Sequence, residues 1–287
     1  MIKSLRPLFL AGLLLPLALP VSAATINTSL TPNVEKALKA SKLQPSALSL
    51  VMVPLDGPGT PTVFNAALNF RQFWDGRVET LEEQSNVVIT SPHEMGSDWR
   101  TVIERIANAP DYRRDFAATY PDGVTRANVQ QALASFERTL LTPNSRFDQY
   151  LLGNTDILTL EEKYGYQRFK EYGCIACHQG VNIGGNMFQK FGVMNDYFAD
   201  RGNPTDADLG RFLITGDEQD RNVFKVPSLR NVAVTAPYFH DGSAKTLEQA
   251  VEVMFKYQLG RTPNPQDTRL IVKFLQTLTG QWQGKPL

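Results

Sequence analysis

Apolar residues recur at intervals of three and four along much of the chain, which places them on one face of an α-helix. Three sets show this spacing most clearly: Trp99, Val102, Ile103 and Ile106; Val129, Leu133, Phe136 and Leu140; and Leu270, Ile271, Phe274, Leu275 and Leu278. Strand-like runs are few, and residues 48–53 form the clearest one. The pattern therefore predicts a mostly α protein.

Two capping boxes mark where helices begin. Thr159 is followed three residues later by Glu162, and Thr246 by Gln249, and each pair leads into a stretch with helical spacing. In a capping box the Thr hydroxyl accepts a hydrogen bond from the third backbone N–H, and the Glu or Gln side chain accepts one from the Thr N–H. A linker-like stretch, residues 142–156, separates the block with the cysteines from the block before it.

The N-terminus has the pattern of a secretory signal. A short charged start precedes an apolar run over residues 7–21, which Pro16 and Pro20 interrupt and which ends in Val21-Ser22-Ala23. A membrane span needs ~20 unbroken apolar residues, whereas a signal peptide has a shorter apolar region and a small-residue exit. We expect cleavage after residue 23, with an uncleaved anchor as the alternative. We expect no membrane span in the mature protein.

Charge excludes one class of partner. Lys and Arg total 29, as do Asp and Glu, so the formal net charge is zero. Phosphate binding relies on clustered positive charge, so the composition argues against a nucleic-acid partner. A local charged patch for docking another protein remains compatible with this balance.

The chain has two cysteines, both in Cys174-Ile175-Ala176-Cys177-His178. In C-x-x-C-H the two thiols add to the haem vinyl groups and the histidine faces the iron. An exported pair also suggests a disulfide, but a thioredoxin-type pair requires a βαβ context and the flanks have helical patterns. A structural zinc site requires four ligands, and no second cysteine pair exists. The motif therefore predicts covalent haem at Cys174 and Cys177, with His178 as an axial ligand.

The second axial ligand is open at this point. The chain has three histidines (His93, His178 and His240) and six methionines. His/Met ligation raises the reduction potential of haem. Met254 follows a capped helix start and is the best candidate, although an ordinary core methionine would fit the same pattern. His240 is compatible with a ligand, a propionate partner or a turn residue.

Eight segments carry a resemblance to a known family, in the same order along the chain. They are residues 61–67 (PTVFNAA), 72–77 (QFWDGR), 81–84 (LEEQ), 94–96 (EMG), 136–140 (FERTL), 174–178 (CIACH), 226–231 (VPSLRN) and 235–242 (TAPYFHDG). Together they resemble the bacterial dihaem cytochrome c peroxidases. The resemblance covers about 200 residues, from 61 to about 262, and is much more specific than C-x-x-C-H alone.

The resemblance implies roles for particular residues. The C-terminal haem of the family transfers electrons and is ligated by the motif histidine and by a methionine that matches Met254. Its N-terminal haem cleaves peroxide, and Gln84 and Glu94 match residues of the distal pocket there. Trp74 matches a tryptophan between the two haems. Glu94 would supply the positioned acid/base that O–O cleavage requires. If the resemblance is set aside, the sequence around Glu94 indicates only a solvent-exposed carboxylate in a loop.

The chain departs from the family in its N-terminal half. No cysteine precedes Cys174 and no histidine precedes His93, so the attachment site of the peroxidatic haem is absent. Gly59 stands where the family commonly has an asparagine that helps to bind calcium. The remaining calcium contacts that the family implies are the backbone carbonyls of Thr235 and Pro237.

These observations predict a mostly α fold: a cytochrome c-like helical haem domain over residues 153–287 and the remnant of a second, similar domain over residues 61–152. A signal peptide (1–23) and an atypical segment (24–60) precede them. We expect a periplasmic cytochrome with one haem c that transfers electrons. The alternative is an active hydrogen peroxide reductase that takes electrons from a small cytochrome or copper protein. The resemblance also implies that the chain could bind calcium and could form a homodimer.

Overall fold

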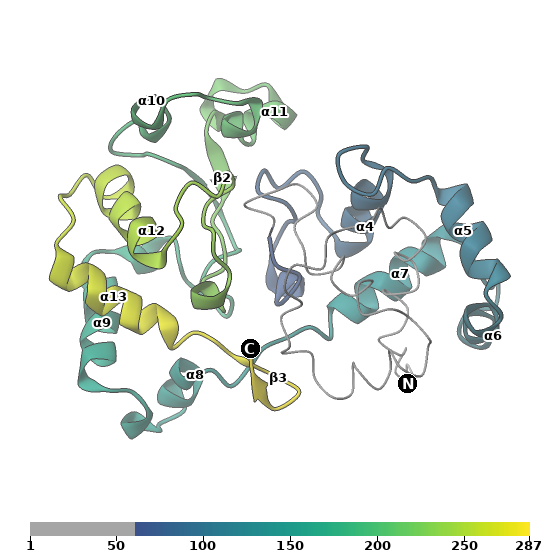
Figure 1. Cartoon of the computed structure of the whole chain (residues 1–287), viewed down its shortest axis with the longest axis horizontal. Coiled ribbons are helices and arrows are strands. Elements are labelled where there is room, and N and C mark those ends of the chain that lie inside the picture. The colour runs from purple at the N-terminus through teal and green to yellow at the C-terminus, as the bar shows by residue number, and fades with distance from the viewer. Residues whose placement is uncertain (1–60) are drawn as a thin grey trace. The chain divides into compact units, whose positions relative to one another are not determined.

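A computed structural model of the chain describes residues 61–287 (Figure 1). They form two compact units: residues 80–140, here the helical unit, and residues 61–79 with 141–287, here the motif unit. The expected signal peptide, the segment 24–60, the strand at 48–53 and Gly59 lie outside the described residues. The chain passes from one unit to the other between residues 79 and 80 and again between residues 140 and 141. The boundary between the two domains that the sequence predicts lies instead after residue 152. That one of these domains is a haem domain and the other the remnant of one stays a prediction.

The helical unit contains α4 (Leu81–Thr90), α5 (Trp99–Asn108), α6 (Pro110–Thr119) and α7 (Arg126–Glu137). Side chains of Thr80, Asp98 and Thr125 cap α4, α5 and α7, and Pro110 begins α6. The helices share one apolar core, which consists, in chain order, of Ile89, Val102, Ile106, Phe116, Val129, Ala132 and Leu133. The helix predicted from the apolar spacing at residues 99–106 is therefore confirmed, and the one predicted at 129–140 is confirmed as far as Glu137, where α7 ends before Leu140.

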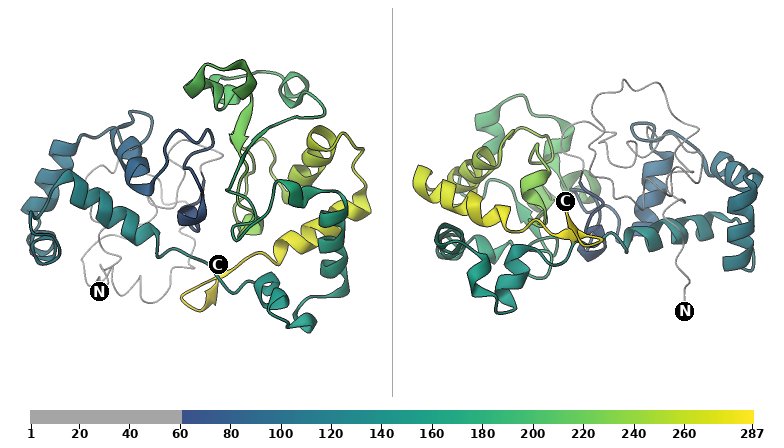
Figure 2. Two further views of the ribbon diagram at one scale, coloured as in Figure 1. Left: turned by 180° about the vertical axis from the view of Figure 1, so that it is seen from behind. Right: turned by 60° about the horizontal axis from the view of Figure 1, so that its bottom comes forward.

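The motif unit is built mainly from short helices (Figure 2). The longer elements are α8 (Arg146–Leu151), α9 (Leu160–Glu171), α10 (Tyr197–Arg201), α11 (Phe212–Thr215), α12 (Leu247–Val253) and α13 (Pro265–Gln276). One-turn 3₁₀ helices are η2 (Ala66–Leu68), η3 (Thr155–Ile157), η4 (Cys174–Ala176), η5 (Asp206–Leu209), η6 (Glu218–Asp220) and η7 (Val232–Val234), and η8 (Met254–Gln258) is π-helical. The fold is mostly α, as the apolar pattern predicts.

Two small antiparallel sheets complete the motif unit. β1 (Phe188–Lys190) pairs with β2 (Val223–Lys225), with Phe188 opposite Lys225, and β3 (Gln281–Trp282) pairs with β4 (Lys285–Pro286). Both predicted capping boxes are present, at the start of α9 and of α12. The stretch expected as a linker, residues 142–156, instead contains α8 and η3, because Ser145 and Asp148 form a further capping box there.

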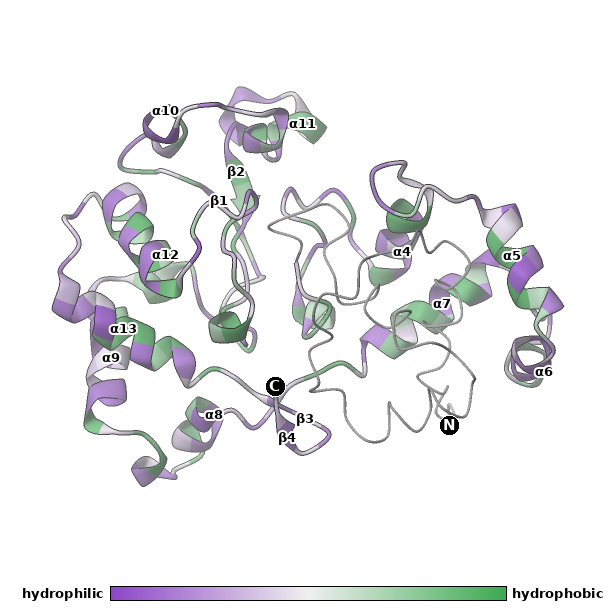
Figure 3. Cartoon of the chain, viewed as in Figure 1, coloured by the Kyte–Doolittle hydropathy of each residue, from purple (hydrophilic) through white to green (hydrophobic). Residues whose placement is uncertain are grey.

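The centre of the motif unit is the crossing of α9 and α13. Gly165 of α9 lies directly against α13, so that a Cβ at this position would stand 1.9 Å from the Leu270 carbonyl oxygen and 2.9 Å from the Phe274 Cβ. Hydropathy alternates around α13 (Figure 3), and its apolar face, including Ile271 and Phe274, joins the main core. Within residues 61–287, no helix has both the length and the apolarity needed to cross a membrane.

Candidate functional site

A tight turn at the end of α9 arranges the C-x-x-C-H residues. Gly173 follows the helix with φ 82°, the left-handed region that glycine enters without steric cost. The chain then makes one 3₁₀ turn, and the backbone N–H of His178 donates to the Cys174 carbonyl at 3.0 Å. Neither thiol is in a disulfide. Cys174, Cys177 and His178 therefore occupy one turn, as attachment of a single group at both sulfurs requires.

The thiol environment argues against a redox-active pair. Burial raises the pKa of Cys174 to about 11. Cysteines that work by thiol–disulfide exchange have lowered pKa values, because the thiolate is the attacking species. Cys174 also packs against the main core. The pair thus has the character of attachment points and not of a redox-active dithiol.

His178 has the properties of a neutral metal ligand. Burial lowers its pKa to about 4, against the opposing effect of the Ile183 and Pro227 carbonyls. The ring is therefore uncharged at neutral pH, the form that donates a lone pair to iron. Its Nδ1 is buried without a hydrogen-bond partner among the described residues. Metal-bound histidines usually give this N–H to a carbonyl, and Pro227 supplies one nearby.

The loop after the motif is held against the segment that follows β2. The N–H of Gly185 donates to the Val226 carbonyl at 2.7 Å, and the N–H of Leu229 donates to the Ile183 carbonyl at 3.1 Å. A Cβ on Gly184 would lie 2.1 Å from the Pro227 oxygen, so only glycine allows this approach. These contacts keep Pro227 beside the histidine.

Met254 lies where α12 gives way to the π-helical η8. Its side chain is half-buried, while its neighbours Val251 and Phe255 belong to the core cluster that Cys174 also joins. The rings of Phe255 and Tyr172 meet edge-on at 4.7 Å. The structure therefore brings the cysteine motif and the Met254 segment to one hydrophobic cluster, and π-helical turns are frequent at functional sites.

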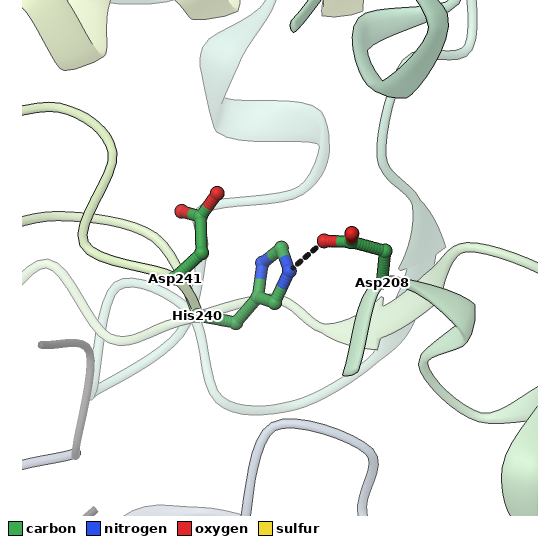
Figure 4. Close-up of side chains that lie close together, drawn as sticks. All are labelled: Asp208, His240 and Asp241. Carbon is green, nitrogen blue, oxygen red and sulfur yellow. Dashed lines mark hydrogen bonds and ion pairs between the residues drawn. The ribbon is translucent and has the colours of Figure 1, made fainter. Parts of the chain in front are cut away.

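His240 is held in an ion cluster (Figure 4). Its Nε2 lies 2.7 Å from Asp208 Oδ1, and both side chains are almost fully buried. The ring stacks on Phe224 with centroids 4.6 Å apart. Burial would raise the pKa of Asp208, but hydrogen bonds from Arg201, the Thr205 N–H and His240 hold it well below its ordinary value. These contacts show a His240 side chain anchored by Asp208 and Phe224, and its role as a ligand, a propionate partner or a turn residue stays a prediction.

Asp208, His240 and Asp241 lie close enough to hold a metal ion, but Arg201 already engages both carboxylates. Its Nη1 donates to Asp208 Oδ1 at 3.0 Å and also bonds to Asp241. The guanidinium thus supplies the positive charge that a metal ion would bring. We interpret the group as a structural ion cluster. Sequence reasoning missed Arg201 and Asp208, whose only signal was a polar loop at residues 201–208.

Trp74 belongs to the motif unit and contacts this cluster. Its ring meets His240 edge-on, with centroids 6.4 Å apart and planes at 72°, and it packs beside Phe224 in an aromatic group. Its carbonyl accepts a hydrogen bond from the Lys225 N–H at 2.7 Å. The backbone of Trp74 is thereby fixed to β2.

Gln84 and Glu94 both belong to the helical unit, Gln84 in α4 and Glu94 in the turn that follows it. That turn folds back on the helix, with the Met95 N–H donating to the Val88 carbonyl at 3.1 Å. Gln84 Oε1 is buried and accepts no hydrogen bond from the described residues. His93, in the same turn, is exposed.

Thr235 and Pro237 lie in the loop after η7. Neither backbone carbonyl accepts a hydrogen bond from a residue within 61–287. Carbonyl oxygens are suitable calcium ligands, since calcium takes oxygen donors in flexible geometry. Two carbonyls alone do not complete a calcium shell of 6–8 oxygens, and Gly59 lies outside the described residues.

Residues 46–156 match the family model described as di-haem cytochrome c peroxidase. Cytochrome c551 peroxidase of Nitrosomonas europaea is 47% identical over 226 residues, which are 78% of this chain and 66% of that protein. Cytochrome c peroxidase Ccp of Escherichia coli is 43% identical, over 78% of this chain and 48% of that protein. The methylamine utilization protein MauG of Methylorubrum extorquens is 32% identical, over 82% of this chain and 68% of that protein.

A solved structure supports the same fold. The crystal structure of a MauG-like protein associated with microbial copper homeostasis has a TM-score of 0.70, at 26% identity, over 79% of each chain. The chain spans 66% of the length of the Nitrosomonas relative and about half of the Escherichia relative.

Proposed function

Because the chain belongs to the dihaem cytochrome c peroxidase family, whose members bind haem, we propose that it is a c-type cytochrome with one haem that transfers electrons. The observation that carries the proposal is the turn with Cys174, Cys177 and His178. It combines two thiols free of a disulfide with a neutral imidazole whose Nδ1 is buried. These residues fit a covalently attached haem, since its axial ligand must be neutral and both sulfurs must face one group.

Bound haem would supply reversible one-electron chemistry. Cys174 and Cys177 would hold it by thioether bonds, and His178 and Met254 would bind the iron. The hydrophobic cluster of α9, α12 and α13 would exclude water from one side of the group. Ile175, between the cysteines, is 42% exposed, so an apolar contact for a redox partner lies beside the attachment site.

The peroxide reductase alternative has one observation in its favour. Gln84 keeps a buried Oε1 without a hydrogen-bond partner among residues 61–287, and a buried polar atom of this kind is compatible with a site for another group. That reaction requires an iron with an open coordination site, and the chain has thiols for one haem. In our proposal Met254 closes that haem, so electron transfer is the better-supported function.

Location and partners follow from the same proposal. Haem c is attached outside the cytoplasm, which agrees with the signal-peptide pattern of residues 1–23 and makes the periplasm the proposed location. A small cytochrome or copper protein is the proposed redox partner. The Thr235 and Pro237 carbonyls are proposed as part of a calcium site, and a homodimer is proposed by family resemblance.

The test is the haem content and turnover of the purified mature protein. We expect one haem per chain, red colour that survives denaturing electrophoresis, and its loss or weakening in Cys177→Ser. Peroxide turnover should be close to that of free haem, and Glu94→Gln should leave it unchanged. A positioned acid/base contributes ~10²–10⁴-fold in rate. Two haems per chain, or robust turnover that collapses in Glu94→Gln, would instead establish the peroxidase alternative.

A further inference from the structure

Lys225, the last residue of β2, is a buried lysine without a counter-ion. It is 5% exposed, and its ammonium group makes no ion pair or hydrogen bond with another residue in the described part of the chain. Burying an unpaired ammonium costs on the order of several kcal/mol, so buried lysines are normally paired. The side chain therefore requires an anion that the described residues do not provide.

The nearest acidic group is already engaged. Asp75 accepts hydrogen bonds from Arg77, from its N–H at 3.1 Å and its Nη1 at 3.0 Å. Burial lowers the pKa of Lys225 to about 8, and the charge of Asp75 offsets only part of that effect. Asp75 therefore does not serve as a full counter-ion to Lys225.

The cations near Lys225 have carboxylate partners of their own. Arg211 lies over the ring of Phe188, which is the strand partner of Lys225, at 4.2 Å from the centroid. Arg211 pairs with Asp220 at 3.5 Å. The guanidinium groups of Arg77 and Arg211 therefore each have a carboxylate partner, whereas the Lys225 ammonium group has none within residues 61–287. One negative charge would neutralise the group.

The position of Lys225 indicates which anion this is. Adjacent strand residues point to opposite faces, and Phe224 packs into the aromatic group with His240, so Lys225 lies on the other face. Two residues later the chain reaches Pro227, whose carbonyl is beside His178. In the other direction, the Lys225 N–H is bonded to the Trp74 carbonyl. The backbone of Lys225 is thus bonded to Trp74 and lies two residues from the carbonyl beside His178.

We propose that Lys225 is the counter-ion of a carboxylate of the bound haem, one of its two propionates. This rests on the proposed function, since it requires haem at Cys174 and Cys177. Lys225 would anchor the haem edge, and its positive charge would stabilise the ferrous over the ferric state. It would be a positioning residue, because it touches the cofactor and not the iron.

The experiment is a potentiometric titration of the haem-loaded protein, with a matched control from the same small sheet. Lys225→Gln should shift the ferrous/ferric equilibrium about tenfold toward ferric, equal to 59 mV for a one-electron couple. Lys190→Gln removes the same charge from an exposed position in β1 and should change the equilibrium less than twofold. Lys225→Arg keeps the charge and should stay within threefold of wild type.

A pH series distinguishes the amine from its surroundings. Between pH 7 and 11 a lysine amine beside a carboxylate begins to lose its proton, whereas a guanidinium group keeps its charge. The wild-type potential should fall over this range, and the potential of Lys225→Arg should not, a comparison that holds even if Lys225→Gln fails to fold.

The outcomes separate the two proposals. Wild-type protein without haem would contradict the proposed function. Haem-loaded Lys225→Gln with a potential equal to that of Lys190→Gln would overturn the role of Lys225 alone. An equal pH dependence in wild type and Lys225→Arg would do the same.

Discussion

Gly165→Ala should destabilise the motif unit although it introduces a better helix former. The new Cβ would lie 1.9 Å from the Leu270 carbonyl oxygen, where ordinary contact begins at 3.4 Å. The helices α9 and α13 would have to separate by 3.4 − 1.9 = 1.5 Å, or bend. Phe274, which is 1% exposed, would lose its packing at this crossing. Overpacking typically costs ~1–3 kcal/mol and occasionally more, whereas Ala gains ~1 kcal/mol over Gly in a helix.

Because an approach of 1.9 Å to a backbone atom places the overpacking cost at the upper end of this range, we expect a net loss of about 3 − 1 = 2 kcal/mol in the free energy of unfolding. For a unit of this size the melting temperature should fall by roughly 4–8 °C, measured by circular dichroism on the haem-loaded protein. Gln167→Ala, on the exposed face of the same helix, is the control and should change stability by less than ~0.5 kcal/mol. A Gly165→Ala protein as stable as this control would show that α9 and α13 do not approach as closely as described.

Two further predictions concern single side chains. Met254→Ala should remove the weak red charge-transfer band of His/Met ferric haem and allow small ligands to bind the iron; survival of the band would place the ligand elsewhere. Burial raises the pKa of Glu137 to about 7, so folding favours the protonated acid and this contribution is lost as pH rises through 7. Glu137→Gln should thus stabilise the protein by up to about 3 kcal/mol at pH 8 and hardly at pH 5, measured by denaturant titration; the exposed Glu104→Gln is the control, and equal effects at both pH values would contradict the burial.

The long helices were predictable because their signals are local. Apolar spacing identified α5, α7 and α13, and capping boxes identified the starts of α9 and α12. The helix α4 was not predicted from its pattern, since its buried positions include Ser85, and a serine does not register as apolar. The closest helix contact, at Gly165, was also not predictable, because a glycine inside a helix is compatible with many contexts until its neighbour is known.

In the candidate site too, the features with a local sequence signal were predictable and those that depend on distant residues were not. A haem attachment motif can be read from sequence because the two thioether positions and the ligand must fall within five consecutive residues, here 174–178. His240 was left with three roles, because its partner Asp208 is 32 residues away and belongs to a loop with no periodic pattern. The unpaired charge at Lys225 depends on side chains from three separate loops and strands. These side chains do not fall within any short window of the sequence. The need of Lys225 for an external carboxylate therefore becomes apparent only in the folded chain.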